Sequence, residues 1–447
     1  MNAANPYLLL TLISLLPTAT AGAEPLRVGA AAVAVEADDS MVIAGGIGPG
    51  KATGQEGELR ATAVVIEKPP GTKLAIVSCD VLFVERDFVD RALERIERST
   101  KIPPSHVLVH ATHTHHAPSV TSIHGYGRDP VFARRLEDGI VKSVELANER
   151  LIGDATFLFH LAEEKTVGQN SRLLLKDGTI FWVGPRDDAV RTTGPFDPEL
   201  PVLAFKSPPD KWIALLYNHS THTIGTRRGA VRSPSFYGLA AQELEAELGG
   251  VCAFLEGASG STHNLGAVTT AQAVDKLKVT IRDALAKAKP RPVERLVSVK
   301  RPFTFKVRTF DEAEEDRKVV DYCRKRIPGG ADFTINVFRQ MRKELSPHKG
   351  KERQTVLQAT LIGDVALVGV PAEYFTKLGL DIKNRSPFPD TFVAELSNDW
   401  IGYLPDREAH KLGGYQTWTG LHSFAEEGTG ERMADEVVAM LMDLRTR

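Results

Sequence analysis

The chain has 447 residues, of which 42% are hydrophobic and 25% are charged, and its formal net charge is -2. This is the composition of an ordinary globular protein, long enough for one large domain or two of typical size. A charge so close to zero provides no field that would attract nucleic acid or an anionic membrane surface, so we expect no nucleic-acid partner.

The N-terminal residues resemble an export signal. Residues 7–16 form an apolar run, and Pro17 and the small residues Ala21-Gly22-Ala23 follow it. This order is typical of a signal peptide cleaved before Glu24. We therefore expect residues 1–23 to be a signal peptide and residues 24–447 to form one exported domain, periplasmic or secreted. The cysteines at 79, 252 and 323 are too few and scattered for a disulfide framework, and Cys79 and Cys252, which lie in apolar strand-like runs, are predicted to be buried thiols.

Strands and helices alternate through the first half of the chain. Strands are predicted at 26–35, 60–67, 73–79 and 107–109, and helices at 88–96 and 131–151. A glycine-rich stretch at 44–51 superficially matches a phosphate-binding loop, but Ala52 follows Lys51 where a hydroxyl would be needed for Mg²⁺. It is predicted to be a flexible loop that could rim a pocket. The alternation favours an α/β to α+β fold with a layered mixed β-sheet core, flanking helices and an active site at strand ends.

Four histidines follow the strand at 107–109, in the sequence V-L-V-H-A-T-H-T-H-H-A-P. If the strand continues, His113 and His115 point to the same side, because side chains alternate along an extended chain. Two imidazoles at the end of a buried strand are suitable ligands for a divalent metal. The alternative is a solvated strand end that happens to be rich in histidine.

Further polar residues follow strands in the second half. A strand at 212–217 runs into Asn218-His219-Ser220-Thr221-His222, and Glu373 follows a strand at 365–370. A strand at 392–396 leads, one loop later, to Tyr403. Because strand ends gather at one edge of a layered sheet, His113, His219, Glu373 and Tyr403 are predicted to converge. Two helices at 310–326 and 333–345 are predicted to form a surface insertion.

Short motifs in the same order resemble the neutral (non-lysosomal) ceramidase family. They are A-T-H-T-H-H-A-P at 111–118, Asn170 to Arg172, N-H-S-T-H-T at 218–223, P-A-E at 371–373, S-N-D-W-I-G-Y at 397–403 and G-G-Y at 413–415. The resemblance implies Zn²⁺ held by His113, His219, Glu373 and Tyr403. His115 would contact these ligands without binding the metal, or would carry a proton. It implies further that Arg172 and Tyr415 polarise the scissile carbonyl and stabilise its oxyanion.

The sequence departs from that family in two places. The family's serine lies in a G-D-x-S-P-N segment, whereas this chain reads G-S-T-H-N at 260–264. Ser261 therefore replaces an aspartate, and His263 stands near the position of the serine. A loop without catalytic duty is the alternative to a reactive Ser261. The chain ends at Arg447 and is expected to lack the family's C-terminal β-sandwich domain.

These features lead to one hypothesis and two alternatives. The hypothesis is a zinc-dependent hydrolase that cleaves the amide bond of a small-molecule or lipid-like N-acyl substrate, with metal-activated water as the nucleophile. His115 or His263 would carry the proton to the leaving amine. The alternatives are an exported metal-dependent enzyme acting on glycans or another polar substrate, and a non-catalytic zinc-containing binding protein. The choice between His113 and His115 as the direct ligand, the oligomeric state and a peripheral membrane contact stay open.

Overall fold

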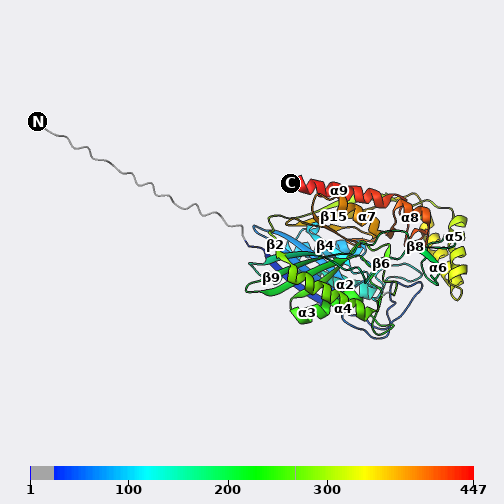
Figure 1. The fold of residues 1–447 in the computed structure, drawn as a ribbon, viewed down its shortest axis with the longest axis horizontal. Helices are drawn as coiled ribbons and strands as arrows, with labels where there is room; N and C mark the ends of the chain where they lie inside the picture. Colours follow the sequence, from blue (N-terminus) through cyan, green and yellow to red (C-terminus); the bar gives the residue numbers. More distant parts are fainter. Residues whose placement is uncertain (2–24, 267, 447) are drawn as a thin grey trace.

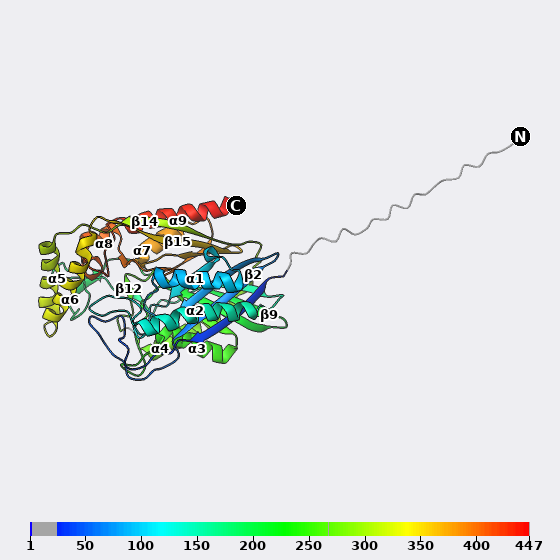
Figure 2. The same ribbon diagram turned by 180° about the vertical axis from the view of Figure 1, so that it is seen from behind.

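A computed structural model describes Met1 and residues 25–266 and 268–446, so the predicted signal peptide, apart from Met1, lies outside the described residues. Within these residues no helix combines the length and the apolar character needed to cross a membrane. Three main sheets and the helices around them make up most of the described chain (Figures 1 and 2).

The first sheet carries the strand that leads to the histidine cluster. Its spatial order is β1-β2-β3-β4, with antiparallel pairs up to β3 and a parallel pair between β3 and β4. Helices α1 and α2 cover one face, where residues such as Phe88 and Phe132 are fully buried. The bounds are β1 (Arg27–Ala34), β2 (Arg60–Lys68), β3 (Thr72–Cys79), β4 (Val107–Ala111), α1 (Arg86–Thr100) and α2 (Pro130–Glu149).

The second sheet has the order β11-β10-β9-β5-β13. Helices α3 and α4 pack on one of its faces, where Tyr217, Phe254 and Leu277 are buried. The bounds are β5 (Thr156–Glu163), β9 (Glu199–Ser207), β10 (Lys211–His219), β11 (Val251–Glu256), β13 (Lys289–Pro290), α3 (Ser235–Leu248) and α4 (Thr270–Lys287).

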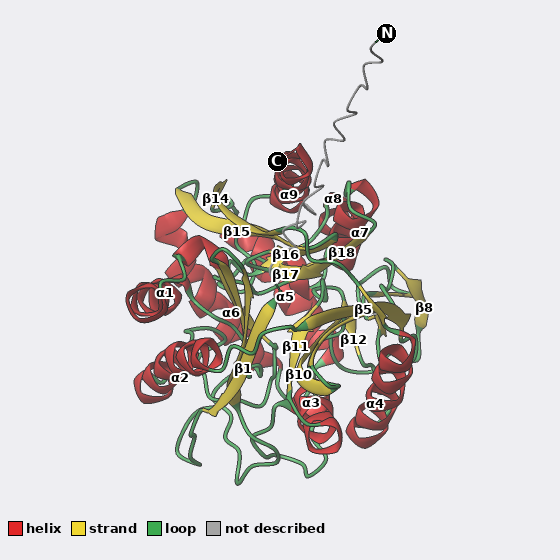
Figure 3. Cartoon of the chain, turned by 90° about the vertical axis from the view of Figure 1, so that its left-hand side faces the viewer, coloured by secondary structure: helices red, strands yellow, loops and turns green. Residues whose placement is uncertain are grey.

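The third sheet has the order β14-β15-β16-β18, and helices α7 and α9 lie along it. One apolar cluster joins all three sheets, through residues such as Leu108, Leu216 and Leu367. Figure 3 shows helices on the outside and strands within. The predicted layered mixed-sheet fold is therefore confirmed. The bounds are β14 (Leu296–Lys306), β15 (Glu352–Ile362), β16 (Val365–Gly369), β18 (Asp390–Ala394), α7 (Thr376–Arg385) and α9 (Thr429–Thr446).

Helices α5 (Glu312–Arg326) and α6 (Ala331–Leu345) lie between β14 and β15 in the chain and pack against each other, near the short helix α8 (Arg407–Leu412) (Figure 1). They were predicted to be a surface insertion, and their place in the chain agrees with that. However, Phe338 of α6 is fully buried against aromatic residues of the 415–422 segment. The insertion therefore supports one wall of the site described below.

Candidate metal centre and its cavity

The histidine cluster begins just beyond the end of β4. The strand ends at Ala111, and His113 adopts a positive φ of 60°, a conformation that histidine tolerates better than most residues. The strand therefore does not continue through His113 and His115, and the prediction that it does is wrong. The turn nevertheless brings their rings together, with 3.3 Å between the two Nε2 atoms.

His222 completes a group of three imidazoles, each offering a nitrogen within 4.8 Å of the others. In all three rings, Nδ1 lies within hydrogen-bond distance of a backbone carbonyl, so the proton resides on Nδ1 and Nε2 presents a lone pair. The carbonyl partners are Leu82 for His113 at 3.0 Å, Gly45 for His115 at 3.1 Å and Ser259 for His222 at 3.0 Å.

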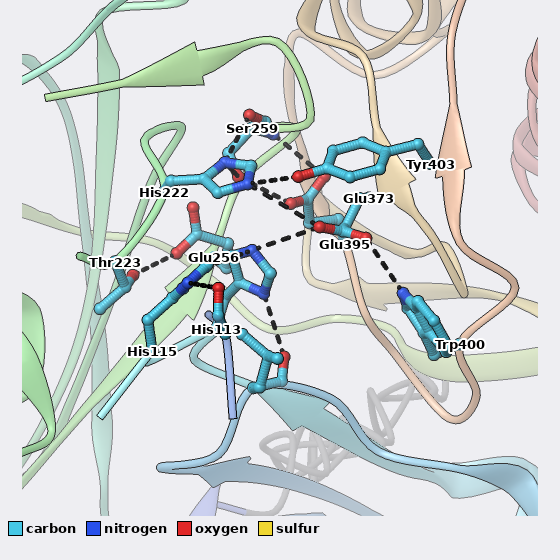
Figure 4. A network of polar contacts seen from close by, with 12 residues as sticks. His113, His115, His222, Thr223, Glu256, Ser259, Glu373, Glu395, Trp400 and Tyr403 are labelled. Atoms are coloured by element: carbon cyan, nitrogen blue, oxygen red, sulfur yellow. Dashed lines mark hydrogen bonds and ion pairs between the residues drawn. The ribbon is translucent and has the colours of Figure 1, made fainter. Parts of the chain in front are cut away.

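Glu373 and Tyr403 reach the same centre from a short parallel pair of strands, β17 (Glu373–Tyr374) and β19 (Tyr403–Leu404). Glu373 Oε1 lies 3.5 Å from His113 Nε2 and 3.8 Å from His222 Nε2. The Tyr403 hydroxyl lies 3.0 Å from His222 Nε2. The other carboxylate oxygen of Glu373 accepts a hydrogen bond of 3.2 Å from the indole of Trp400 (Figure 4).

Two of these separations match those between ligands of a single divalent ion. Two ligand atoms on a tetrahedral zinc, each at 2.0–2.1 Å from the metal, are about 3.3–3.4 Å apart. The His113–His115 separation of 3.3 Å and the His113–Glu373 separation of 3.5 Å lie near that value. Burial lowers the pKa of His113 to about 4 and raises the pKa of Glu373 to about 8. Neutral imidazoles and a carboxyl group that a cation would help to ionise are the donors such a site needs.

His219 does not join this group, which corrects the sequence prediction. Along β10, Tyr217 and His219 share the face that packs under α3, because side chains alternate on a strand. The His219 ring lies 2.5 Å from the Tyr237 hydroxyl through Nδ1 and 3.0 Å from the Glu164 carbonyl through Nε2. His222, three residues past the end of the strand, takes the place expected for His219.

A buried carboxyl group, that of Glu395, links two parts of the centre through hydrogen bonds. Its side chain accepts hydrogen bonds from the backbone N–H of Tyr374 at 2.6 Å and from the N–H and hydroxyl of Ser259 at 3.0 and 2.7 Å. Tyr374 adjoins Glu373, and the Ser259 carbonyl holds His222. Sequence reasoning missed Glu395; its place at the end of β18, before Ser397-Asn398, was the available signal.

The centre opens into a cavity of about 420 Å³. None of the residues that line it is Lys, Arg, Asp or Glu, and most of its wall is apolar. The lining comprises Gly45, Gly46, Ile47, His115, Ser171, Phe181, Trp182, Val183, Ile224, His263, Leu265, Tyr403, Tyr415 and Gln416. The glycine-rich stretch at 44–51 thus rims the pocket, as expected. A larger groove of about 870 Å³ runs along α5 and α8 and contains none of the clustered histidines.

Tyr415 lines the cavity, whereas Arg172 lies behind it. The Arg172 guanidinium is buried and donates to Gln416 Oε1 at 2.7 Å and to the carbonyl oxygens of Ala409 and Gly413 at 3.2 and 2.6 Å. It is not among the residues that line the cavity. The prediction that Arg172 polarises a substrate carbonyl is therefore replaced by a supporting role for the segment that carries Tyr415.

Ser261 also lies outside the cavity, with its hydroxyl 3.1 Å from the Thr376 hydroxyl. Its predicted alternative, a loop position without catalytic duty, matches this placement. His263 does reach the cavity: its ring stacks on His222 with 3.8 Å between centroids, and its Nδ1 lies 2.8 Å from the Ser171 hydroxyl.

Comparison with known proteins gives fold-level matches. No protein-family model matches the chain, and no curated protein matches its sequence. The crystal structure of neutral ceramidase from Pseudomonas aeruginosa matches with a TM-score of 0.75 at 19% identity, covering 95% of this chain and 75% of that one. A ceramidase complexed with C2 matches with a TM-score of 0.75 at 18% identity, covering 95% and 76%. At this identity the comparison shows a shared fold.

Proposed function

We propose that the protein is a zinc-dependent hydrolase of an N-acyl amide bond, similar in chemistry to the neutral ceramidases whose fold it shares. The observation that carries the proposal is the convergence of three imidazoles and the Glu373 carboxyl group beside a cavity that His115 and Tyr403 line. The fold alone does not determine an activity, so the donor set is the main support.

The donors to the ion would come from His113, His115, His222 and Glu373, with the Tyr403 hydroxyl beside them. Three protein ligands are enough to hold a catalytic zinc, which keeps one position open for water. A divalent ion there would supply Lewis acidity to water and to a carbonyl oxygen. The donor set contains no thiolate, whereas structural zinc sites are commonly rich in thiolates, and this favours a catalytic site over the alternative of a non-catalytic binding protein.

The side chains of the cavity wall favour a lipid-like substrate over a polar polymer. Phe181, Trp182 and Leu265 provide an apolar surface that suits an acyl chain, and none of the residues that line the cavity has a charged side chain to bind a carboxylate or ammonium group. A polar polymer such as a glycan would leave many hydroxyl groups without partners against this wall. The amide of a lipid-like substrate can reach the histidine cluster while its chain remains on the apolar side.

Two side chains of the cavity would take part in this hydrolysis. Burial raises the pKa of Tyr415 well above its usual value, so its hydroxyl stays protonated and can donate to a developing oxyanion. The His263 ring is oriented by Ser171 through Nδ1, which leaves its Nε2 to carry a proton toward the leaving amine.

The test is zinc quantification on purified protein together with hydrolysis of a panel of N-acyl compounds of different chain length. We expect about one zinc per chain, and activity that is lost with a chelator and restored by Zn²⁺. Hydrolysis of glycans but not of amides would contradict the proposal, as would amide hydrolysis by metal-free protein. His160→Gln, a change on β5 away from the cavity, serves as the control.

A further inference from the structure

The ring of Tyr415 is clamped between two aromatic neighbours. Trp182 stacks on it with 4.4 Å between centroids and an interplanar angle of 2°, and His422 stacks on it at 4.9 Å and 25°. His422 Nε2 also lies 3.1 Å from the Tyr415 carbonyl, which fixes the backbone beneath the ring. Because the ring is fixed, the remaining freedom of the Tyr415 side chain is rotation of the hydroxyl hydrogen about the C–O bond.

His124 faces that hydroxyl from outside the metal-binding group. Its Nε2 lies 3.2 Å from the Tyr415 oxygen, and the residue is only 6% exposed. Its backbone has a φ of 52°, and its carbonyl accepts a hydrogen bond of 2.8 Å from Gly48. Among the described residues, its other ring nitrogen, Nδ1, is buried and has no hydrogen-bond partner.

The partnerless Nδ1 decides which nitrogen carries the proton. Burial lowers the pKa of His124 well below its usual value, so the ring is neutral and has one N–H. A proton on Nδ1 would leave a buried donor unpaired, and orphaned buried N–H groups are rare. A proton on Nε2 leaves only an acceptor unpaired and places the donor against the Tyr415 oxygen.

We propose that His124 is a positioning residue whose Nε2–H donates to the Tyr415 oxygen and thereby turns the Tyr415 O–H toward the cavity. The hydroxyl is then ready to donate to the oxyanion that forms when the amide carbonyl is attacked. Donors that are oriented before the reaction stabilise a transition state more than donors that must reorient. This inference rests on the proposed amide hydrolysis, because it assigns the direction of a proton used in that reaction.

The test is a double-mutant cycle on the zinc-loaded full chain, with His124→Phe, Tyr415→Phe and the double variant. For Tyr415→Phe, the loss of one oxyanion donor predicts a fall in kcat of about 100–1,000-fold. His124→Phe should lower kcat about 10-fold or more with KM changed less than about 3-fold, because the substrate-binding wall is intact. The double variant should be no slower than Tyr415→Phe, since His124 acts through the hydroxyl.

Whether kcat falls or rises in His124→Phe shows which of His124 and Tyr415 donates the hydrogen bond between them. If Tyr415 instead donated to His124, removing the imidazole would free the hydroxyl proton, and kcat would stay the same or rise. That result would overturn the proposal, and so would additive effects in the double variant.

Two more variants guard against a folding artefact. His124→Gln keeps an N–H at the position of Nε2 and should retain kcat within about 3-fold, whereas His124→Asn tolerates the positive φ but is too short to reach, and should behave like His124→Phe. Loss of activity in all three variants with unchanged zinc content and melting temperature would contradict the proposal. If the wild-type protein hydrolyses no N-acyl compound, the proposed function fails, and non-additive shifts in melting temperature across the cycle still report the His124–Tyr415 hydrogen bond.

Discussion

Glu373 and Tyr403 are direct partners in the parallel pair β17–β19, so their side chains project from the same side of the two strands. The 29 residues between them, which include α7 and β18, return the chain so that Tyr403 pairs with Glu373. Two residues on each strand are too few to hold this arrangement alone. The backbone N–H of Tyr374, the neighbour of Glu373, therefore matters, and it donates to Glu395.

Glu395→Gln should weaken zinc binding. The two carboxyl oxygens of Glu395 share three hydrogen bonds, and the amide of Gln keeps only one oxygen, so the Glu373 strand and the Ser259 loop lose a shared partner. Outer-shell changes of this kind cost about 10- to 100-fold in metal affinity. Competition with a chromophoric chelator measures the affinity, and Glu94→Gln on the exposed face of α1 is the matched control. Equal zinc affinity in both variants would show that Glu395 does not support the centre.

His222→Ala and His219→Ala should have different effects. His222→Ala removes one of the three imidazoles and should reduce zinc content to a small fraction of the wild-type value. His219→Ala should retain zinc and lower the free energy of unfolding by about 1–3 kcal/mol, because the buried Tyr237 hydroxyl loses its partner. Elemental analysis and denaturant unfolding of both variants distinguish the effects, and zinc loss in His219→Ala alone would reverse the assignment.

The sequence could predict the fold class and much of the candidate site, because each depends on local pattern. Buried β-branched runs such as Val107-Leu108-Val109 predict central strands, and polar residues directly after them predict a convergent edge. His113, Glu373 and Tyr403 were placed in the centre in this way. The buried state of Cys79 and Cys252 was also predicted, and it is confirmed.

The errors come from backbone geometry that side-chain alternation does not encode. The positive φ of His113 ends the alternation of side chains that a strand would show. No residue type in the motif predicts this backbone conformation. His219 was chosen as the metal ligand in place of His222. Choosing correctly requires knowing the residue at which β10 ends and the face of the sheet that α3 covers. Arg172 was misplaced because its partners, the carbonyl oxygens of Ala409 and Gly413, are more than 230 residues away.

Removing the metal should lower the melting temperature, and zinc should restore it. Without a cation, the lone pairs of His113 and His115 face each other at 3.3 Å, next to a buried carboxyl group. An ion that binds only the folded state stabilises it by about 2.7 kcal/mol at 100 times its dissociation constant. Thermal unfolding in EDTA, followed by titration with Zn²⁺, measures the shift. His222→Ala should show no response, and an equal response in that variant would place the ion elsewhere.

Lys300 should make stability rise with pH. Burial on β14 lowers the pKa of its ammonium group to about 7, with Arg86 opposing and Asp90 supporting the charge. Between about pH 7 and its ordinary pKa of 10.5, the unfolded chain binds the proton more strongly, so the free energy of unfolding increases with pH. Lys300→Met removes the penalty and should stabilise the protein by about 1–3 kcal/mol at pH 7. Denaturant unfolding at pH 7 and pH 10 checks whether the advantage shrinks at the higher pH; a constant difference would exclude titration of Lys300 as its cause.

Ser261→Ala should leave amide hydrolysis almost unchanged. The Ser261 hydroxyl is bonded to the Thr376 hydroxyl and accepts from the Thr376 N–H, so it supports the start of α7 and not the cavity. Losing these bonds should cost about 1 kcal/mol of stability, while kcat stays within about 3-fold of wild type. Ser171→Ala is the matched comparison, because it removes a hydroxyl that lines the cavity and lies 2.8 Å from His263 Nδ1. We expect kcat to fall about 10-fold or more in Ser171→Ala, since the His263 ring loses the partner that orients it. A larger loss in Ser261→Ala than in Ser171→Ala would return a catalytic role to Ser261.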